Sequence, residues 1–317
     1  PRRSLPALAR PVKNGAWPGC GCRGMMPVRG HMLGRQTRGS VVCTSCGNLV
    51  GVNDETCYTC GRRNPGLWGF APLLRRLGTD LGFVPLVMWG STGLYVATLL
   101  ASGGNIRMTG LFSFLAPSTT SLFLFGASGG MPVFEYGRWW TVLSAGWLHS
   151  GILHILFNMM WVRQLGPACA DLYGAGRMIL IYTVAGIAGF SASSGAWLLF
   201  GGIPILGGAG FTVGASAPIF GLLGALVHYG QRSGSSLMRR EGLQYALMLG
   251  VFGLIMPGID NWAHAGGFAG GWLMARILDP LKPERLDHLL LALGCLMATM
   301  VAIAASLLHG MALFARQ

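Results

Sequence analysis

The sequence predicts an all-α, polytopic membrane protein with a small metal-binding ribbon near its N-terminal end. The 317 residues are 52% hydrophobic and only 10% charged, which is too apolar for a soluble chain of this length. In addition, seven apolar stretches come near the length that crosses a hydrocarbon core of about 30 Å. They are residues 82–102, 147–166, 177–200, 215–230, 242–258, 262–278 and 288–314.

The ribbon is predicted from two C-x-x-C pairs, each followed by a glycine that permits a tight turn. The four cysteines are Cys43, Cys46, Cys57 and Cys60. Four thiolates suit tetrahedral Zn²⁺, and a four-ligand site leaves no open position for water, so we expect a structural zinc ion and no catalytic cofactor. A disulfide pair or redox thiols are the alternatives, which a reducing cytoplasm disfavours.

Basic residues predict the orientation in the membrane. Twelve of the 23 lysine and arginine residues precede Asp80, and most of the others fall in alternate loops. Because cytoplasmic loops carry such an excess, the N-terminus and the ribbon are expected in the cytoplasm, and seven spans would leave the C-terminus outside. The net charge of +13 is explained by this topology, and no nucleic-acid partner is predicted.

The fourth span begins with a candidate nucleophile, Ser216. Pro218 is tolerated only in the first helical turn, so the helix should begin near residues 214–216. Ser216 is then at the N-terminus of the helix on the outer side, where unpaired N–H groups and the helix dipole favour an oxyanion. Taken alone, a serine that packs or bonds between helices is the alternative.

The sixth span is expected to bring His264 to a similar depth. A histidine inside a membrane is costly and usually functional, although a structural histidine is the alternative. Gly267-x-x-x-Gly271 follows it, a spacing that lets helices approach closely. The small residues of the fourth span that can face these glycines are Gly214, Ala217, Gly221 and Gly224.

The second span carries His154 and Asn158, four residues apart and therefore on one helical face. Both side chains have donors that can polarise a carbonyl group beside a nucleophile. A hydrogen bond between helices or to water is the alternative for each. His149 falls on a different face and is expected to anchor the outer loop.

Together these residues resemble the rhomboid family of intramembrane serine proteases. The resemblance covers residues 82–279. Its motifs are His149, His154-x-x-x-Asn158, Gly214-Ala-Ser216 and His264-x-Gly266-Gly267-x-x-x-Gly271. It implies a six-helix core that cuts transmembrane segments of other proteins near the outer face, using a dyad of Ser216 and His264 without a third acid. His154 and Asn158 would then hold the oxyanion, and the seventh span would be an appended C-terminal helix.

The resemblance completes the predicted domain plan. The chain is expected to consist of a disordered segment (1–40), the zinc ribbon (41–64), a linker and interfacial segment (65–81), the six-helix core (82–279) and the seventh helix (280–317). Two departures from the family pattern stand out. Ala217 replaces the glycine that follows the nucleophile, and Arg138-Trp139-Trp140-Thr141 replaces the usual Trp-Arg, which leaves the anchoring of the outer loop open.

The predicted partners are transmembrane protein substrates and the lipid bilayer, with a cytoplasmic partner for the ribbon as a further hypothesis. The main alternative is a non-proteolytic rhomboid-like protein that binds client helices and uses the ribbon for docking. A small channel or transporter is a weaker alternative, because the spans were expected to lack buried charged residues. Retention of both Ser216 and His264 favours the protease.

Overall fold

The computed structural model describes residues 35–44, 46–72, 77–108, 110, 114–201, 203 and 206–315. By its contacts the chain divides into two units, residues 1–34 and 35–317, and only the second contains described residues. Most of the segment predicted to be disordered, and part of the predicted interfacial segment, therefore lie outside the described residues. The predicted domain limits stay predictions.

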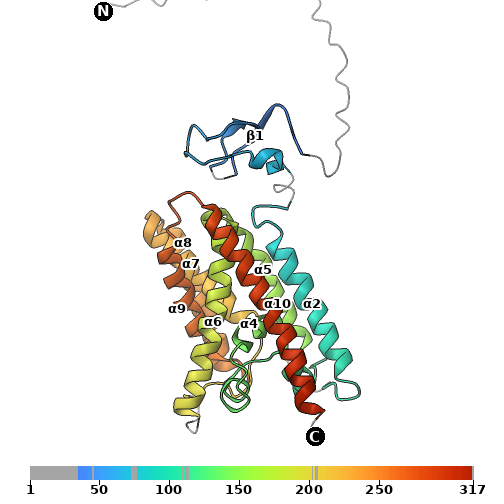
Figure 1. Ribbon diagram of the computed structural model, residues 1–317. Coiled ribbons are helices and arrows are strands. Elements are labelled where there is room, and N and C mark those ends of the chain that lie inside the picture. Colours follow the sequence, from blue (N-terminus) through green and yellow to red (C-terminus); the bar gives the residue numbers. More distant parts are fainter. Residues whose placement is uncertain are drawn as a thin grey trace, which may run out of the picture. The chain divides into compact units, whose positions relative to one another are not determined.

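Among the described residues, seven long helices lie side by side in one bundle (Figure 1). They are α2 (Phe83–Ala101), α5 (Ile152–Tyr173), α6 (Ala175–Phe200), α7 (Ser216–Ser233), α8 (Ser236–Ile255), α9 (Asn261–Ile277) and α10 (Leu286–Phe314). Each overlaps one of the seven predicted spans, so the prediction of an all-α polytopic fold is confirmed. The shorter elements are β1 (Ser40–Val42), β2 (Leu49–Gly51), η1 (Leu67–Gly69), α3 (Thr119–Phe125), η2 (Met131–Glu135), α4 (Thr141–Ser144) and η3 (Ala145–Trp147).

The long helices differ in how readily each would cross a membrane alone. Among the described residues, α2, α6 and α10 are each long and apolar enough to do so. The segment formed by α4 and η3 (Thr141–Trp147) meets this criterion only together with α5, and the axes of that segment and α5 are bent by 94°. Helices α7 and α9 are rich in glycine, and they do not meet it. Such helices are stable in a bilayer when other helices enclose them.

The second predicted span is wrong at its start. Helix α5 begins at Ile152 and not near Trp147. Between them, Leu148 (φ −97°, ψ 154°) and Gly151 (φ 172°, ψ 165°) have extended backbones, which cannot continue an α-helix. The break leaves His149 between two helical segments and places His154 in the first turn of α5.

Helix α7 is central, as the sequence predicted for the fourth span. Every residue from Ala217 to His228 is buried. Helix α7 packs against α5, α6, α8 and α9. At the crossing with α9, a Cβ atom added to Gly267 would lie 2.2 Å from the carbonyl oxygen of Ala217, and one added to Gly271 would lie 2.3 Å from the Cα atom of Gly221. The glycines therefore bring two helix backbones into direct contact, which confirms the predicted packing.

Two irregular segments lie at the end of the bundle where α7 begins. The α3–α5 segment (residues 126–151) contains η2, α4 and η3, and the α6–α7 loop (residues 201–215) leads into Ser216. The two segments pair through an antiparallel bridge between Ser128 and Thr212. Each of these two residues donates its backbone N–H to the carbonyl of the other, at N–O distances of 3.0 and 2.7 Å.

Candidate active site and metal cluster

Ser216 is the first residue of α7, where the sequence predicted the helix to begin. The N–H groups of Ser216 and Ala217 have no hydrogen-bond partner among the described residues, and Pro218 has no N–H. The first bond of the helix runs from Ile219 to the carbonyl of Ala215. The half-buried serine hydroxyl is therefore next to free donors at the positive end of the helix dipole.

His264 lies in the first turn of α9, only 8% exposed. Its ring stacks on Phe220 of α7, with ring centres 4.2 Å apart and planes 16° apart. Phe220 follows Ser216 by four residues, so both side chains lie on one face of α7, about one turn or roughly 6 Å apart along the axis. The imidazole is thus held against the face of α7 that also carries the serine. The sequence did not identify Phe220, because its i+4 spacing places it on the face of Ser216 without indicating that it meets His264.

The start of α9 is fixed by Asp260. Its carboxylate accepts hydrogen bonds from the N–H of Ala263 at 3.0 Å and from the hydroxyl of Ser193 in α6 at 2.6 Å. The Ser193 hydroxyl also accepts the N–H of Ala209 in the α6–α7 loop. A helix N-cap of this kind stabilises the first turn, and here it ties the turn that carries His264 to two neighbouring elements.

His154 presents a defined donor toward the start of α7. The N–H of Ser150 points at its Nδ1 atom at 3.4 Å, and the Ser150 hydroxyl lies 2.9 Å from the same nitrogen. Because Nδ1 accepts the backbone N–H, the proton of the neutral ring is on Nε2. A Cβ atom added to Gly214 would lie 2.6 Å from this Nε2. Gly214 therefore faces His154 of α5 and not the glycines of α9, which corrects that part of the predicted packing.

Asn158 and His149 flank His154. The amide nitrogen of Asn158 donates to the carbonyl of His154 at 2.8 Å, so one donor of this buried side chain is directed back onto its own helix. His149 is fully buried and packs edge-on against His154, with ring centres 5.2 Å apart. Among the described residues, neither ring nitrogen of His149 has a hydrogen bond of normal geometry.

The methyl group of Ala217, where the family pattern has glycine, is accommodated inside the bundle. Ala217 is completely buried. A Cβ atom added to Gly189 of α6 would lie 2.7 Å from the Cβ atom of Ala217. The glycine at position 189 therefore provides the space that the additional methyl needs, and this methyl packs against α6.

Comparison with known protein families matches residues 136–280 to the rhomboid domain. This part of the chain is a rhomboid domain. The rhomboid protease GluP of Bacillus subtilis (strain 168) is 34% identical over 187 residues, which cover 58% of this chain and 34% of GluP. RHOMBOID-like protein 7 of Arabidopsis thaliana is 31% identical over 191 residues, 54% of this chain and 56% of that protein. RHOMBOID-like protein 2 of the same plant is 30% identical over 222 residues, 62% of this chain and 66% of that protein. The chain thus spans between a third and two thirds of the length of these relatives.

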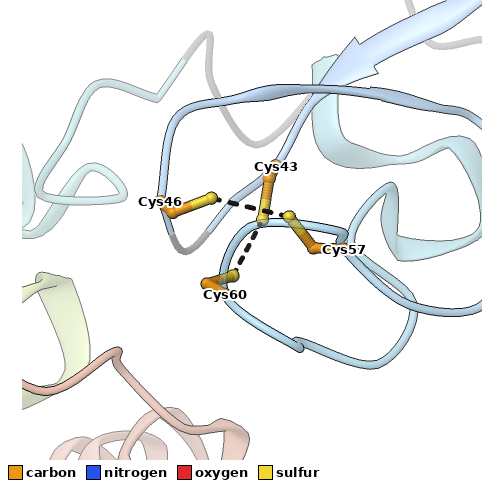
Figure 2. A group of neighbouring side chains, drawn as sticks. All are labelled: Cys43, Cys46, Cys57 and Cys60. Carbon is orange, nitrogen blue, oxygen red and sulfur yellow. Dashed lines mark hydrogen bonds between the residues drawn. The ribbon is translucent and has the colours of Figure 1, made fainter.

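The rhomboid domain is preceded by the four predicted cysteines, whose sulfur atoms all lie within 4.8 Å of one another. Figure 2 shows the sulfur atoms directed toward a common centre, with contacts from Cys43 to Cys60 at 3.8 Å and from Cys46 to Cys57 at 3.6 Å. A tetrahedral ion with metal–sulfur bonds of about 2.3 Å requires sulfur atoms about 3.8 Å apart, whereas a disulfide requires about 2.05 Å. The cluster therefore fits a metal ion and not a disulfide.

The two C-x-x-C loops share one backbone hydrogen bond and a glycine with positive φ. In each loop the N–H of the following glycine, at φ +77° for Gly47 and +69° for Gly61, donates to the carbonyl of the first cysteine. The N–H groups of Cys60 and Thr59 lower the pKa of the Cys57 thiol to about 6, while burial raises the pKa of the Cys60 thiol to about 12. A bound cation would supply the charge that keeps both thiols deprotonated. These residues can hold a metal ion.

Proposed function

We propose that this chain is an intramembrane serine endopeptidase that cleaves transmembrane segments near the outer face of the membrane. Ser216 is the nucleophile and His264 is the general base. The stacking of His264 on Phe220, one turn from Ser216 on the same face of α7, is the observation that supports this assignment most directly. The similarity to a rhomboid protease supports the class of reaction.

In the proposed reaction, His264 accepts the proton of the Ser216 hydroxyl while the oxygen attacks the scissile carbonyl. The tetrahedral intermediate collapses when His264 returns the proton to the leaving amine, and water then cleaves the acyl-enzyme by the same steps. Other serine proteases orient the histidine with a carboxylate. Here the Phe220 ring takes over that orienting task.

The oxyanion is held by donors from two helices. The free N–H groups of Ser216 and Ala217 lie at the N-terminus of α7, and the Nε2–H of His154 is directed at Gly214, two residues before the nucleophile. Preorganised donors of this kind stabilise charge that develops in the transition state. Asn158 contributes its second amide proton, because its first is bonded to the carbonyl of His154.

The proposed substrates are helices that unwind easily near the outer face, since a fully hydrogen-bonded helix hides its scissile amide. The distribution of arginine and lysine supports a cytoplasmic N-terminus and ribbon, an active site that opens outward and an external C-terminus. The hypothesis of a cytoplasmic partner for the ribbon has no support among the described residues.

A covalent probe tests the nucleophile. The full-length chain, purified in detergent, is treated with a fluorophosphonate and followed by gel fluorescence. We expect labelling of the wild type, none of Ser216→Ala and reduced labelling of His264→Ala. Ser194→Ala is the matched control, because Ser194 of α6 is buried with an unpartnered hydroxyl and should not affect labelling. Equal labelling of Ser216→Ala would exclude Ser216 as the nucleophile, and a wild type that is never labelled would favour the non-proteolytic helix binder.

For the ribbon we propose zinc as the bound metal, in a purely structural role. Purified wild type is expected to contain about one zinc ion per chain by mass spectrometry, and Cys57→Ser to lose it. Cys169→Ser is the control, because this buried thiol lies in α5, outside the cluster. Fluorophosphonate labelling should survive in folded Cys57→Ser. Its complete loss would contradict the separation of ribbon and active site, and retention of zinc would contradict the ligand assignment.

A further inference from the structure

Arg138 joins the α3–α5 segment to the last helix, α10. Its side chain is completely buried. The guanidinium donates to the carbonyl of Phe123 in α3 at 2.6 Å and to the carbonyl of Ser306 in α10 at 2.9 Å, and it lies 4.1 Å from the centre of the Phe123 ring. A buried charge of this kind is tolerated only where such acceptors replace water.

Trp140 makes a second connection to the same turn of α10. Its Nε1–H donates to the hydroxyl of Ser306 at 3.1 Å, and its ring packs edge-on against His309. A Cβ atom added to Gly126 would lie 2.3 Å from the Ser144 hydroxyl and 2.7 Å from that of Ser306. The end of α3, helix α4 and α10 therefore meet at Ser306.

The same segment also holds the chain immediately before the nucleophile. Ala145 accepts the N–H of Gly214 at 3.0 Å. The hydroxyl of Thr141 donates to that of Ser128, whose backbone pairs with Thr212. A continuous set of hydrogen bonds thus runs from α10 through the α3–α5 segment to the α6–α7 loop.

The opposite end of α10 is fixed independently by Arg177, in the first turn of α6. Its guanidinium donates to the carbonyls of Asp279 and Lys282 in the connection between α9 and α10. Its backbone N–H donates to Glu284 at 3.1 Å. Because both ends of α10 are bound, Ser306 has little freedom to move relative to the rest of the domain.

We infer that α10 positions the nucleophile. Ser306, Arg138 and Trp140 are positioning residues that anchor the α3–α5 segment, and through it the backbone at Gly214 and Ser216. The catalytic consequence of this anchoring rests on the proposed function, whereas its structural part does not.

Ser306→Ala tests the inference, with Thr299→Ala as the matched control. Both residues are buried on α10, but within the described part of the chain the Thr299 hydroxyl bonds only to the carbonyl of Cys295 in its own helix. We expect hydrogen exchange at the amides of Thr212 and Gly214 to accelerate about tenfold in Ser306→Ala alone, because a buried donor on Trp140 loses its acceptor. The rate of fluorophosphonate labelling should fall by a similar factor, with the half-saturating probe concentration unchanged.

Trp140→Phe provides a second route, since it removes only the donor and keeps most of the ring. The variant that combines Ser306→Ala with Trp140→Phe should show the same exchange and labelling rates as Ser306→Ala alone, because both substitutions remove the same hydrogen bond. The inference would be overturned if the two substitutions lowered the labelling rate additively. It would also be overturned if the Thr212 and Gly214 amides exchanged equally fast in Ser306→Ala and Thr299→Ala. Faster exchange with unchanged labelling would overturn the catalytic part. If exchange is faster in Ser306→Ala but the probe never labels the wild type, the anchor is supported and the protease is refuted.

Discussion

His264→Asn is expected to lower the cleavage rate of a transmembrane reporter by on the order of 10³-fold or more. Asparagine is similar in size to histidine and can hydrogen-bond, but it cannot accept the proton of Ser216 near neutral pH. The stack on Phe220 places the ring at the helix face that carries Ser216, so the substitution removes the proposed base from that face. The measurement is the initial rate of reporter cleavage in proteoliposomes.

His228→Asn is the matched control for this prediction. His228 is also on a central helix and is 7% exposed, compared with 8% for His264. Its Nδ1 atom contacts the hydroxyl of Tyr173, near the opposite end of α7 from Ser216. Cleavage by folded His228→Asn should stay within about threefold of the wild type, the margin of a small structural perturbation. Normal cleavage by His264→Asn would remove the imidazole from the mechanism.

The sequence was sufficient where a local rule decides the structure. Pro218 limits where α7 can begin, and Ser216 is its first residue. The spacing of Gly267 and Gly271 predicted close helix packing, and their missing side chains do leave room for the backbone of α7. In the ribbon, each C-x-x-C pair has the turn that its following glycine permits. These features depend on neighbours within a few residues.

The sequence was not sufficient where the partner is distant along the chain. Arg138 and Arg177 are both buried, with acceptors 168 and more than 100 residues away along the chain. The expectation that the spans lack buried charged residues is therefore wrong at Arg177, the first residue of the third predicted span, whereas Arg138 lies outside the predicted spans. Phe220 could not be assigned to His264 either, because the crossing of α7 and α9 determines which aromatic ring the imidazole meets.

Gly214 shows how a correct pattern can lead to a wrong contact. It was grouped with the small residues of the fourth span, but it precedes α7 and has φ +129°, a conformation that favours glycine. Its open side is occupied by His154 of α5. The glycine therefore brings the ring of His154 close to the start of α7, which hydropathy and helical spacing alone do not reveal.

Gly267→Ala is expected to lower the Tm by roughly 5–10 °C and cleavage by on the order of 10²-fold. The added Cβ atom would lie 2.2 Å from the carbonyl oxygen of Ala217, about 1 Å closer than non-bonded contact allows. Because that oxygen belongs to the backbone of α7, no rotamer change can relieve the overlap, and α7 and α9 must separate. Ser216 and His264 lie on these two helices, so the separation should increase the distance between them.

The same substitution at Gly294 of α10 should raise the Tm. Nothing lies within 4 Å of a Cβ atom there, and replacing a helical glycine by alanine stabilises by about 0.4–1 kcal/mol through the unfolded state. Thermal unfolding in detergent and reporter cleavage are measured for both variants. A shared decrease in Tm would point to a general intolerance of larger side chains in the bundle. A decrease confined to Gly267→Ala, together with lost cleavage, would tie the proposed chemistry to the contact between the α7 and α9 backbones.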